Sequence, residues 1–339
     1  MKDRLLDFLA CPGCRGDLRL EDPVQAENFP WREIVSGKLV CQDCQENYPI
    51  KNGVPRMLTN NKKSLEVRET VDGFGYEWET YNHLIQNTYM SSRENFFDFI
   101  HPVTENYFEN KTILDAGCGM GRFLRLGAHF GSREIIGLDL SSSVEAAYQN
   151  TFRLPNAHVV QGDILELPLK REFDFIFSIG VLQFLSEPEK GFRELTGLLK
   201  PGGRISIWVY SKENNGWVIR FLTPFREKFT SRLPRPALLF LSRALGFVYF
   251  LLLRLFYKPT NEWSVFKRIG FRLPYNDYFY YNLRLSYTDL SSVIFDHLVP
   301  QLVVYLSKEE VLEWFNNCHL KIVEASSRNN MSWRAHGMM

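Results

Sequence analysis

Three glycines, Gly117, Gly119 and Gly121, follow an apolar run that ends at Asp115 in the segment ILDAGCGMGRF. The apolar run predicts a buried parallel strand, and the alternating glycines allow positive φ and close approach of backbone amides to a ligand. A helix predicted to begin at Arg122 points its N-terminus at the same place. This segment is therefore predicted to bind a ligand, although a glycine-rich turn alone does not say which one.

Further acidic residues lie at the ends of the strands predicted next along the chain. Asp139 ends EIIGLDL, where a carboxylate can accept both hydroxyl hydrogens of a ribose. Asp163 follows AHVVQG, where an acid can accept from an exocyclic adenine amine while apolar neighbours enclose the ring. One such acid alone is most often a helix cap or a solvated loop residue. Several of them at successive strand ends predict a nucleoside site.

The glycine spacing differs from that of a dinucleotide site. The dinucleotide pattern is G-x-G-x-x-G, and its third glycine position holds Arg122 here. Asp115 would also repel a pyrophosphate, whereas it suits a ligand that carries an ammonium and a sulfonium. S-adenosylmethionine has both groups together with adenine and ribose, so we predict it as the cofactor.

The surrounding segments alternate between strand and helix patterns from residue 111 onwards. Their order is ILDAG, GRFLRLGAHF, EIIGLDL, SSVEAAYQNTF, AHVVQG, FDFIFSIG, EKGFRELTGLL and RISIWVY. This alternation predicts an α/β fold with a doubly wound parallel sheet. Ligands bind such sheets at the carboxyl ends of the strands, which is where the acids lie.

Residues 110 to 210 resemble the class I S-adenosylmethionine-dependent methyltransferases, specifically the type 11 group that includes ubiquinone and menaquinone biosynthesis enzymes. The segments LDAGCGMG, GDI, FDFIFSIGVLQF and LLKPGGRISI carry the resemblance. It implies a Rossmann-like methyltransferase sheet in which Asp115 and the first glycines hold the amino acid moiety, Asp139 the ribose and Asp163 the adenine. The predicted cofactor-binding residues are Asp115, Gly117, Cys118, Gly119, Gly121, Asp139, Leu140, Gly162, Asp163, Ile164 and Ser178. Where many relatives read V-L-H-H, this chain has Val181-Leu-Gln-Phe184, so proton abstraction by a histidine is not expected there.

Four cysteines near the N-terminus have the spacing of a metal site. Cys11 and Cys14 form one CxxC pair, and Cys41 and Cys44 form a second, as in a zinc ribbon. A redox dithiol would need only one pair beside a βαβ unit, and a disulfide is disfavoured in a reducing compartment. Four thiolates on one Zn²⁺ would supply folding free energy that this small segment lacks. We therefore predict a structural zinc site.

The amino-acid sequence around the cysteines shows a second resemblance. Residues 1 to 58, with LLDFLACPGCRGDL and LVCQDCQENYPIKNGVPRML, resemble the small zinc-ribbon protein that activates tRNA and release-factor methyltransferases. The resemblance implies a fused N-terminal copy that retains all four cysteines.

The composition describes a folded protein with a balanced charge. The chain has 339 residues, of which 45% are hydrophobic and 23% charged, with a formal net charge of +1. Charges interrupt the short apolar stretch at the N-terminus, so a secretory signal is not expected and a cytoplasmic location is predicted. The near-neutral charge, and the lack of clustered Lys and Arg with stacking aromatics near the ribbon, disfavour nucleic acid as a partner.

The chain is expected to divide into four regions. They are the zinc ribbon (1–60), a linker with N-terminal lid helices (61–110), the S-adenosylmethionine-binding methyltransferase domain (111–210 plus 307–339) and an inserted, largely helical substrate cap (211–306). The cap is inferred because the last helix and hairpin of the sheet appear only from LSKEEVLEWFNNC onwards. In the lid, Tyr76 or Trp78 is expected to close over the ligand.

The cap contains a long apolar run, residues 237–256, that is interrupted by Arg243 and Arg254. Two arginines at this spacing fall on nearly the same face of a helix and would be costly inside a bilayer. Three interpretations stay open: a buried cap or homodimer helix, a helix lying on anionic lipid, and a membrane span. The second implies a location peripheral to the inner face of a membrane.

No nucleophile constellation is found, as expected for an in-line methyl transfer that depends on alignment and exclusion of water. The only candidates for a catalytic acid or base are Asp296, His297 and Tyr76, although a lone histidine is more often structural. The apolar, aromatic cap favours a small or lipid-like acceptor, with the O, N or C atom left open. The alternatives are an RNA base methyltransferase and a non-catalytic, cofactor-binding activator of a partner methyltransferase.

Overall fold

The computed structural model describes residues 1–339 except residues 28, 62, 86–87, 171–172 and 264–272. Within this described part, the strands form one 11-stranded sheet in the order β1-β2-β3-β4-β7-β6-β5-β8-β9-β11-β10. The strands are β1 (Leu18–Gln25), β2 (Ile34–Cys41), β3 (Asn47–Lys51), β4 (Val54–Met57), β5 (Thr112–Ala116), β6 (Glu134–Asp139), β7 (Ala157–Gly162), β8 (Phe173–Ile179), β9 (Leu199–Tyr210), β10 (Lys321–Arg328) and β11 (Ser332–Met338).

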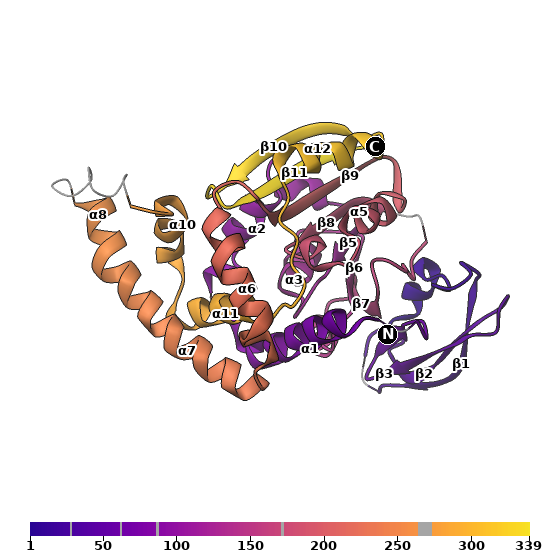
Figure 1. Cartoon of the computed structure of the whole chain (residues 1–339). Helices are drawn as coiled ribbons and strands as arrows, with labels where there is room; N and C mark the ends of the chain where they lie inside the picture. The colour runs from indigo at the N-terminus through magenta and orange to yellow at the C-terminus, as the bar shows by residue number, and fades with distance from the viewer. Residues whose placement is uncertain (28, 62, 86–87, 171–172, 264–272) are drawn as a thin grey trace.

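The helices lie around this sheet and in one extension from it (Figure 1). They are α1 (Leu65–Thr80), α2 (Arg93–Phe99), α3 (Arg122–His129), α4 (Val144–Thr151), α5 (Pro188–Thr196), α6 (Thr223–Lys228), α7 (Arg235–Leu252), α8 (Lys258–Glu262), α10 (Asn276–Tyr281), α11 (Tyr287–Leu298) and α12 (Lys308–Asn317).

The centre of the sheet is parallel. β7, β6, β5, β8 and β9 pair in parallel, and β11 then joins β9 in the antiparallel direction. β5 is buried along its whole length because helices cover both faces, which is why its sequence is a continuous apolar run up to Asp115. The predicted fold class, a doubly wound α/β sheet of the methyltransferase type, is confirmed.

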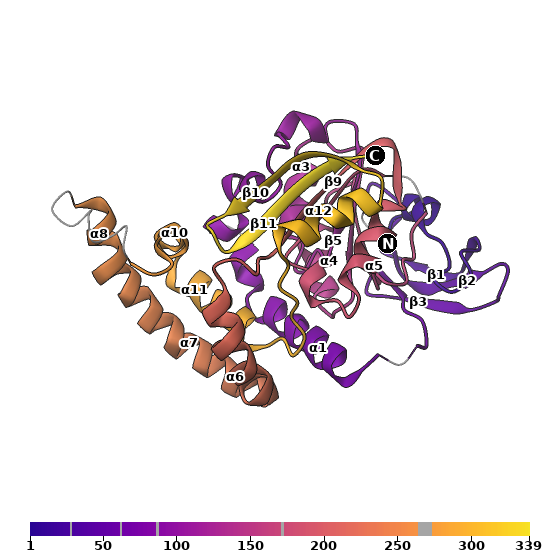
Figure 2. The same cartoon turned by 45° about the horizontal axis from the view of Figure 1, so that its top comes forward.

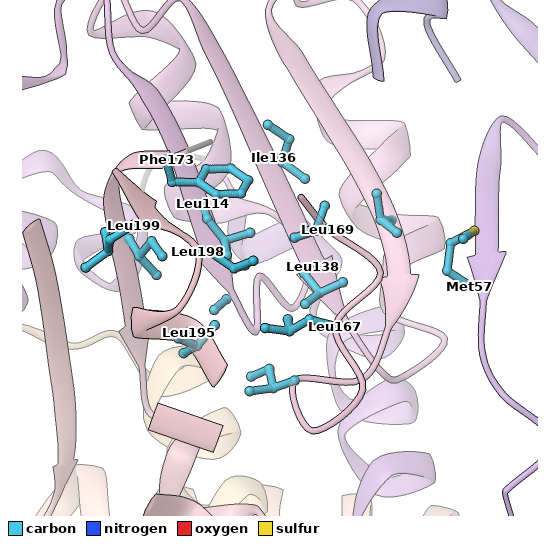
Figure 3. Close-up of a cluster of buried hydrophobic side chains, with 14 of the residues drawn as sticks. Met57, Leu114, Ile136, Leu138, Leu167, Leu169, Phe173, Leu195, Leu198 and Leu199 are labelled. Atoms are coloured by element: carbon cyan, nitrogen blue, oxygen red, sulfur yellow. The ribbon is translucent and has the colours of Figure 1, made fainter. Parts of the chain in front are cut away.

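The N-terminal ribbon continues the same sheet. β4 pairs in parallel with β7, matching Arg56 to Gln161 and Met57 to Gly162. One hydrophobic cluster contains residues of both parts, and Figure 3 shows Met57 pointing towards the leucines of the central sheet. The ribbon and the central sheet therefore share a core. The limits of the four regions predicted from the sequence, including the limit at residue 60, stay predictions.

The segment between β9 and α12 is largely helical. Helices α6 to α11 extend away from the sheet at the end opposite the ribbon, as both views show (Figures 1 and 2). α7 and α11 pack closely at Gly246. A larger residue there would not fit, because its Cβ would lie 2.6 Å from Ser291 Oγ. α11 begins with a capping box in which Ser286 and Asp289 each accept from the other's backbone amide.

Residues Arg235–Glu262 form one long helix that includes the predicted apolar run. By length and composition alone this helix could cross a membrane. Of its most apolar 18-residue stretch, 22% is buried inside the protein. Phe240 is 75% exposed and Leu255 is 64% exposed. A single helix that meets these criteria is weak evidence, and the membrane contact predicted for residues 237–256 is not supported. The soluble-type α/β fold is compatible with the predicted cytoplasmic location.

The shared core leads to a prediction about Met57, which is fully buried. Replacing Met57 with Ala is expected to lower the free energy of unfolding by roughly 2 to 5 kcal/mol, because it leaves a cavity between the ribbon and the sheet. Denaturant titration followed by tryptophan fluorescence should show one transition that moves as a whole. The matched control is Leu58→Ala on the neighbouring, 36% exposed residue, where little change is expected. Two separate transitions, of which only one moves, would contradict the shared core.

Candidate functional site

A cavity of about 940 Å³ lies where the carboxyl ends of the parallel strands meet the cap. It is lined by residues of the glycine loop after β5, of the ends of β6 and β7, and of α1, α7, α10 and α11. The predicted cofactor-binding residues that line it are Asp115, Gly117, Cys118, Gly119, Asp139, Leu140, Gly162, Asp163 and Ile164. The structure thus brings most of the predicted site together, while the role of each residue stays a prediction.

The glycine loop has the backbone conformation expected from its sequence. Gly117, Gly119 and Gly121 have φ values of 89°, 52° and 80°. A Cβ at Gly117 would lie 2.1 Å from Val181 Cγ2, so a larger residue would collide with the loop after β8. Gly121 is the N-cap of α3, and its Cα faces Ala147 of α4. Gly121 is not among the residues that line the cavity; it allows α3 and α4 to pack.

Two carboxylates stand at the floor of the cavity. Asp139 Oδ2 accepts from the amide of Gly119 at 2.9 Å, and its Oδ1 accepts from the amide and hydroxyl of Ser141 at 2.9 and 2.7 Å. Asp115 is 3% exposed, and its Oδ2 has no hydrogen-bond partner. Burial, together with the charge of Asp139, raises the pKa of Asp115 well above its usual range. This unpartnered acceptor fits a cationic group, such as the ammonium of S-adenosylmethionine.

The predicted adenine acid lies beneath the linker that follows the ribbon. Asp163 Oδ1 accepts from the amide of Leu165 at 2.8 Å, and its Oδ2 is paired with the ammonium of Lys63. Glu166 accepts from Thr59 and Asn61. The sequence predicted only a linker at this position, because a run of polar and charged residues does not show which distant carboxylates it contacts in the fold. The structure therefore adds Lys63 to the cavity wall.

The two proposed lid aromatics lie in different places. Trp78 lines the cavity, and its indole lies against Gly119. The ring of Tyr76 stacks on Phe295 with centroids 6.1 Å apart and does not line the cavity. Tyr76 therefore packs against the cap in this structure, and its selection as a catalytic candidate stays a prediction. Both lie on α1, but side chains two positions apart on a helix face different directions.

Ser178 is also outside the cavity. Its side chain is fully buried, and its hydroxyl donates to the carbonyl of Ala116 at 2.9 Å. This bond joins β8 to the end of β5 just before the glycine loop. Ser178 therefore supports the loop rather than lining the cofactor site.

Arg122 lines the cavity and lies between two aromatic rings. Its guanidinium carbon is 5.1 Å from the ring centroid of Trp78 and 4.7 Å from that of Phe123. Burial lowers the pKa of Arg122, and the nearby carboxylates of Glu77, Asp296 and Asp115 oppose this shift. The sequence indicated that Arg122 begins a helix and breaks the dinucleotide pattern. Its place among the acidic groups of the cavity depends on α1 and α11, which carry Glu77 and Asp296.

Asp296 and His297 both line the cavity. Asp296 Oδ2 accepts from the hydroxyl of Tyr210 at 3.2 Å. Glu77, on α1, is fully buried and accepts from the hydroxyl of Ser292 at 2.8 Å. Burial, followed by the charge of Asp296, raises the pKa of Glu77 well above its usual value. The cap thus places an acid and a base at the same cavity as the glycine loop.

The four cysteines of the ribbon form a compact cluster. Their Sγ atoms all lie within 4.8 Å of one another, with Cys11 to Cys44 at 3.7 Å and Cys14 to Cys41 at 3.4 Å. A tetrahedral zinc with Zn–S bonds of about 2.3 Å places its sulfurs about 3.8 Å apart. The donor set therefore fits a zinc ion with four protein ligands, which is the pattern of a structural site.

Comparisons with known proteins match two separate parts of the chain. Residues 114–207 match the family described as "Methyltransferase domain", and residues 2–53 match "Trm112p-like protein". Among relatives, a tRNA U34 carboxymethyltransferase of Pseudoalteromonas atlantica is 31% identical over 102 residues, covering 29% of this chain and 32% of the relative. A trans-aconitate 2-methyltransferase of Deinococcus radiodurans is 32% identical over 122 residues, covering 36% and 46%. The chain thus spans less than half the length of these relatives.

Among solved structures, the complex of the Haloferax volcanii Trm112 methyltransferase activator with a methyltransferase aligns at 15% identity and a TM-score of 0.47. The alignment covers 79% of this chain and 96% of that one.

One prediction about partners is wrong. The near-neutral charge was taken to disfavour nucleic acid, yet several relatives of the central domain are tRNA U34 carboxymethyltransferases, from Pseudoalteromonas and Shewanella. Net charge averages the ribbon, sheet and cap together, whereas contacts with a nucleic acid depend on a local surface. Charge balance therefore does not exclude RNA.

The two matched segments belong to the two parts of the sheet that the pairing of β4 with β7 joins. The segment 2–53 contains the cysteine cluster, and the segment 114–207 contains the glycine loop. Residues 114–207 therefore form a region of the methyltransferase-domain type, and residues 2–53 a Trm112p-like region whose four-cysteine cluster fits a zinc ribbon; together they fit a class I S-adenosylmethionine-dependent methyltransferase with an N-terminal zinc ribbon.

Proposed function

We propose that this protein transfers the methyl group of S-adenosylmethionine to a small or lipid-like molecule held beneath the cap. The observation that carries the proposal is one shared cavity, in which carboxylates from the strand ends face apolar and aromatic side chains of the inserted helices. S-adenosylmethionine, when bound, would supply an electrophilic methyl group next to this apolar space.

The chain's own residues fit the parts of the cofactor. Asp115, with its unpartnered Oδ2, would take the ammonium, and Asp139, held by Gly119 and Ser141, would accept from the ribose hydroxyls. Asp163 would accept from the adenine amine, sharing its carboxylate with Lys63. Trp78 lies over the loop and would exclude water from it.

The cap side of the cavity supports an apolar acceptor. Trp217, Leu222, Leu245, Val248 and Leu252 line it, and they come from α7 and from the segment that precedes it. Side chains of this kind bind through area and shape and leave the polar groups to fix orientation. Methyl transfer in such a site depends on alignment of the acceptor with the methyl carbon.

Methylation of an RNA base is the second candidate. It is supported by the tRNA U34 carboxymethyltransferases among the proteins whose sequences are similar to part of this chain. Incubation with methyl-labelled S-adenosylmethionine and an extract of the source cells, separated into RNA, protein and small-molecule fractions, distinguishes the candidates. We expect label in the small-molecule fraction. Label confined to RNA would replace the first candidate with the second, and cofactor binding without any label would favour a non-catalytic activator.

Cofactor affinity should depend on the charge of Asp139. We expect Asp139→Asn to raise the Kd for S-adenosylmethionine about 10- to 100-fold, because hydrogen bonds to a charged acceptor contribute roughly 1.5 to 3 kcal/mol. Isothermal titration calorimetry measures the change. The control is Asp72→Asn, the same substitution at an exposed position of α1 that does not line the cavity. Equal affinity in the two variants would remove Asp139 from the cofactor site.

The purified protein should contain about one zinc ion per chain, as expected for a four-cysteine site. Cys44→Ser should lower the zinc content and the thermal stability, because the small ribbon relies on the metal. Cofactor affinity should fall as well, since β4 pairs with β7 and the following linker reaches Asp163. Elemental analysis and calorimetry test this, with Cys318→Ser as the control outside the ribbon. Zinc-free wild-type protein with four titratable thiols would contradict the proposed site.

A further inference from the structure

Four titratable side chains meet in the cavity wall where the cap covers the end of β9. The hydroxyl of Tyr210 donates to Asp296 Oδ2 at 3.2 Å, and the hydroxyl of Tyr278 lies 3.5 Å from His297 Nε2. The rings of Tyr210 and His297 are 6.0 Å apart and tilted by 31°. All four side chains line the cavity, although they come from β9, α10 and α11.

The surroundings favour a neutral imidazole. Burial lowers the pKa of His297 below its ordinary value; the carboxylate of Asp296 raises it and the charge of Arg226 lowers it. His297 is therefore unprotonated at neutral pH and can accept a proton. The charged and titratable groups that face this pair from other elements are Glu77, Arg122, Tyr210, Arg226 and Tyr278.

Asp296 links the cluster to the cofactor loop. Arg122, which directly follows the glycine loop, is close enough to lower the pKa of Asp296 against the larger effect of burial. The charge of Asp115 also raises the pKa of Arg122, as does that of Asp296. The Arg122 guanidinium thus lies near both the carboxyl group of the cap and the carboxyl group assigned to the cofactor. The cluster and the glycine loop therefore line the same cavity.

Aromatic rings shape the space beside the cluster. Tyr305 stacks on Tyr210 with centroids 5.9 Å apart, and Phe184 meets the same ring edge-on at 5.9 Å. Trp208 and Phe279 also line the cavity. Rings that line a cavity offer their faces and edges to a flat aromatic molecule beside them. A hydroxyl on an aromatic ring is acidic enough to lose its proton to an imidazole as its oxygen attacks.

We propose that His297 is the general base for O-methylation of a ring hydroxyl on an aromatic acceptor. This inference rests on the proposed methyltransferase function. The acceptor oxygen forms a bond to the methyl carbon as the bond from that carbon to the donor sulfur breaks. The hydroxyl proton passes to His297, and the sulfonium becomes a neutral thioether, so the single positive charge moves from sulfur to imidazole. His297 then returns its proton to water.

Asp296 is a positioning residue in this scheme. Its carboxylate stabilises the imidazolium that forms on His297, and Tyr210 holds the carboxylate in place through its hydrogen bond. Asp296→Asn is expected to lower kcat while leaving KM unchanged, and to shift the acid limb of the pH profile to lower pH, because the pKa of His297 loses its upward influence. A merely structural role for Asp296 would not move this limb.

The test compares His297→Asn with His319→Asn in the full-length protein. His319 is exposed and has a φ of 56°, which asparagine adopts readily, so the same substitution is made outside the cavity. Each variant receives methyl-labelled S-adenosylmethionine and the small-molecule fraction of the source-cell extract, and cofactor binding is measured separately by calorimetry. We expect His297→Asn to bind the cofactor normally, to lose about 100-fold or more in methyl transfer, and to lose the rise of rate with pH near and below pH 6.5.

The outcomes separate this inference from the function on which it rests. An O-methylated aromatic product, made by the wild type and by His319→Asn but not by His297→Asn, supports it. Full activity of His297→Asn, an N-methylated product, label found only in RNA, or cofactor binding with no transfer by the wild type would each overturn it. A wild-type protein that fails to bind S-adenosylmethionine would overturn the proposed function as well.

Discussion

The parallel pairing of β4 with β7 joins the N-terminal ribbon to the central sheet. It matches only two residue pairs, Arg56 with Gln161 and Met57 with Gly162, yet it makes the ribbon an extension of the central sheet. The chain then leaves β4 beside the end of β7, so Lys63 meets Asp163 and α1 starts at the mouth of the cavity. An edge strand with free backbone groups invites such pairing, and here the partner is part of the same chain.

Charge is the second constraint on the molecule. Asp115, Glu77 and Asp296 are brought to one cavity, where burial raises the pKa of each carboxyl group. Arg122 is the cation at their centre, and its stacking between Trp78 and Phe123 keeps it there. The remaining need for positive charge suits a cofactor that carries a sulfonium and an ammonium.

The fold and the cofactor end of the site could be predicted because they depend on short segments. The apolar run before Asp115, the positive φ at the glycines and the order of strands and helices are local properties of the chain. The positions of Lys63, Trp78 and Arg122 in one cavity depend on contacts between segments far apart in sequence, which residue patterns do not encode. Gly121 and Ser178 were selected with their neighbours, but they support packing next to the site. The argument from net charge against nucleic acid was wrong because it averaged over surfaces that lie far apart.

The α/β sheet, the cysteine spacing that suits zinc and the glycine turn that excludes a dinucleotide could be read from the residues alone, since each follows from neighbouring positions. The tertiary structure alone decided that the ribbon shares the core of the sheet, that Tyr76 packs while Trp78 covers the loop, and that Asp296 and His297 meet Tyr210 and Tyr278. These contacts join residues that lie from 19 to more than two hundred positions apart in the sequence, so they form only when distant segments come together in the folded chain.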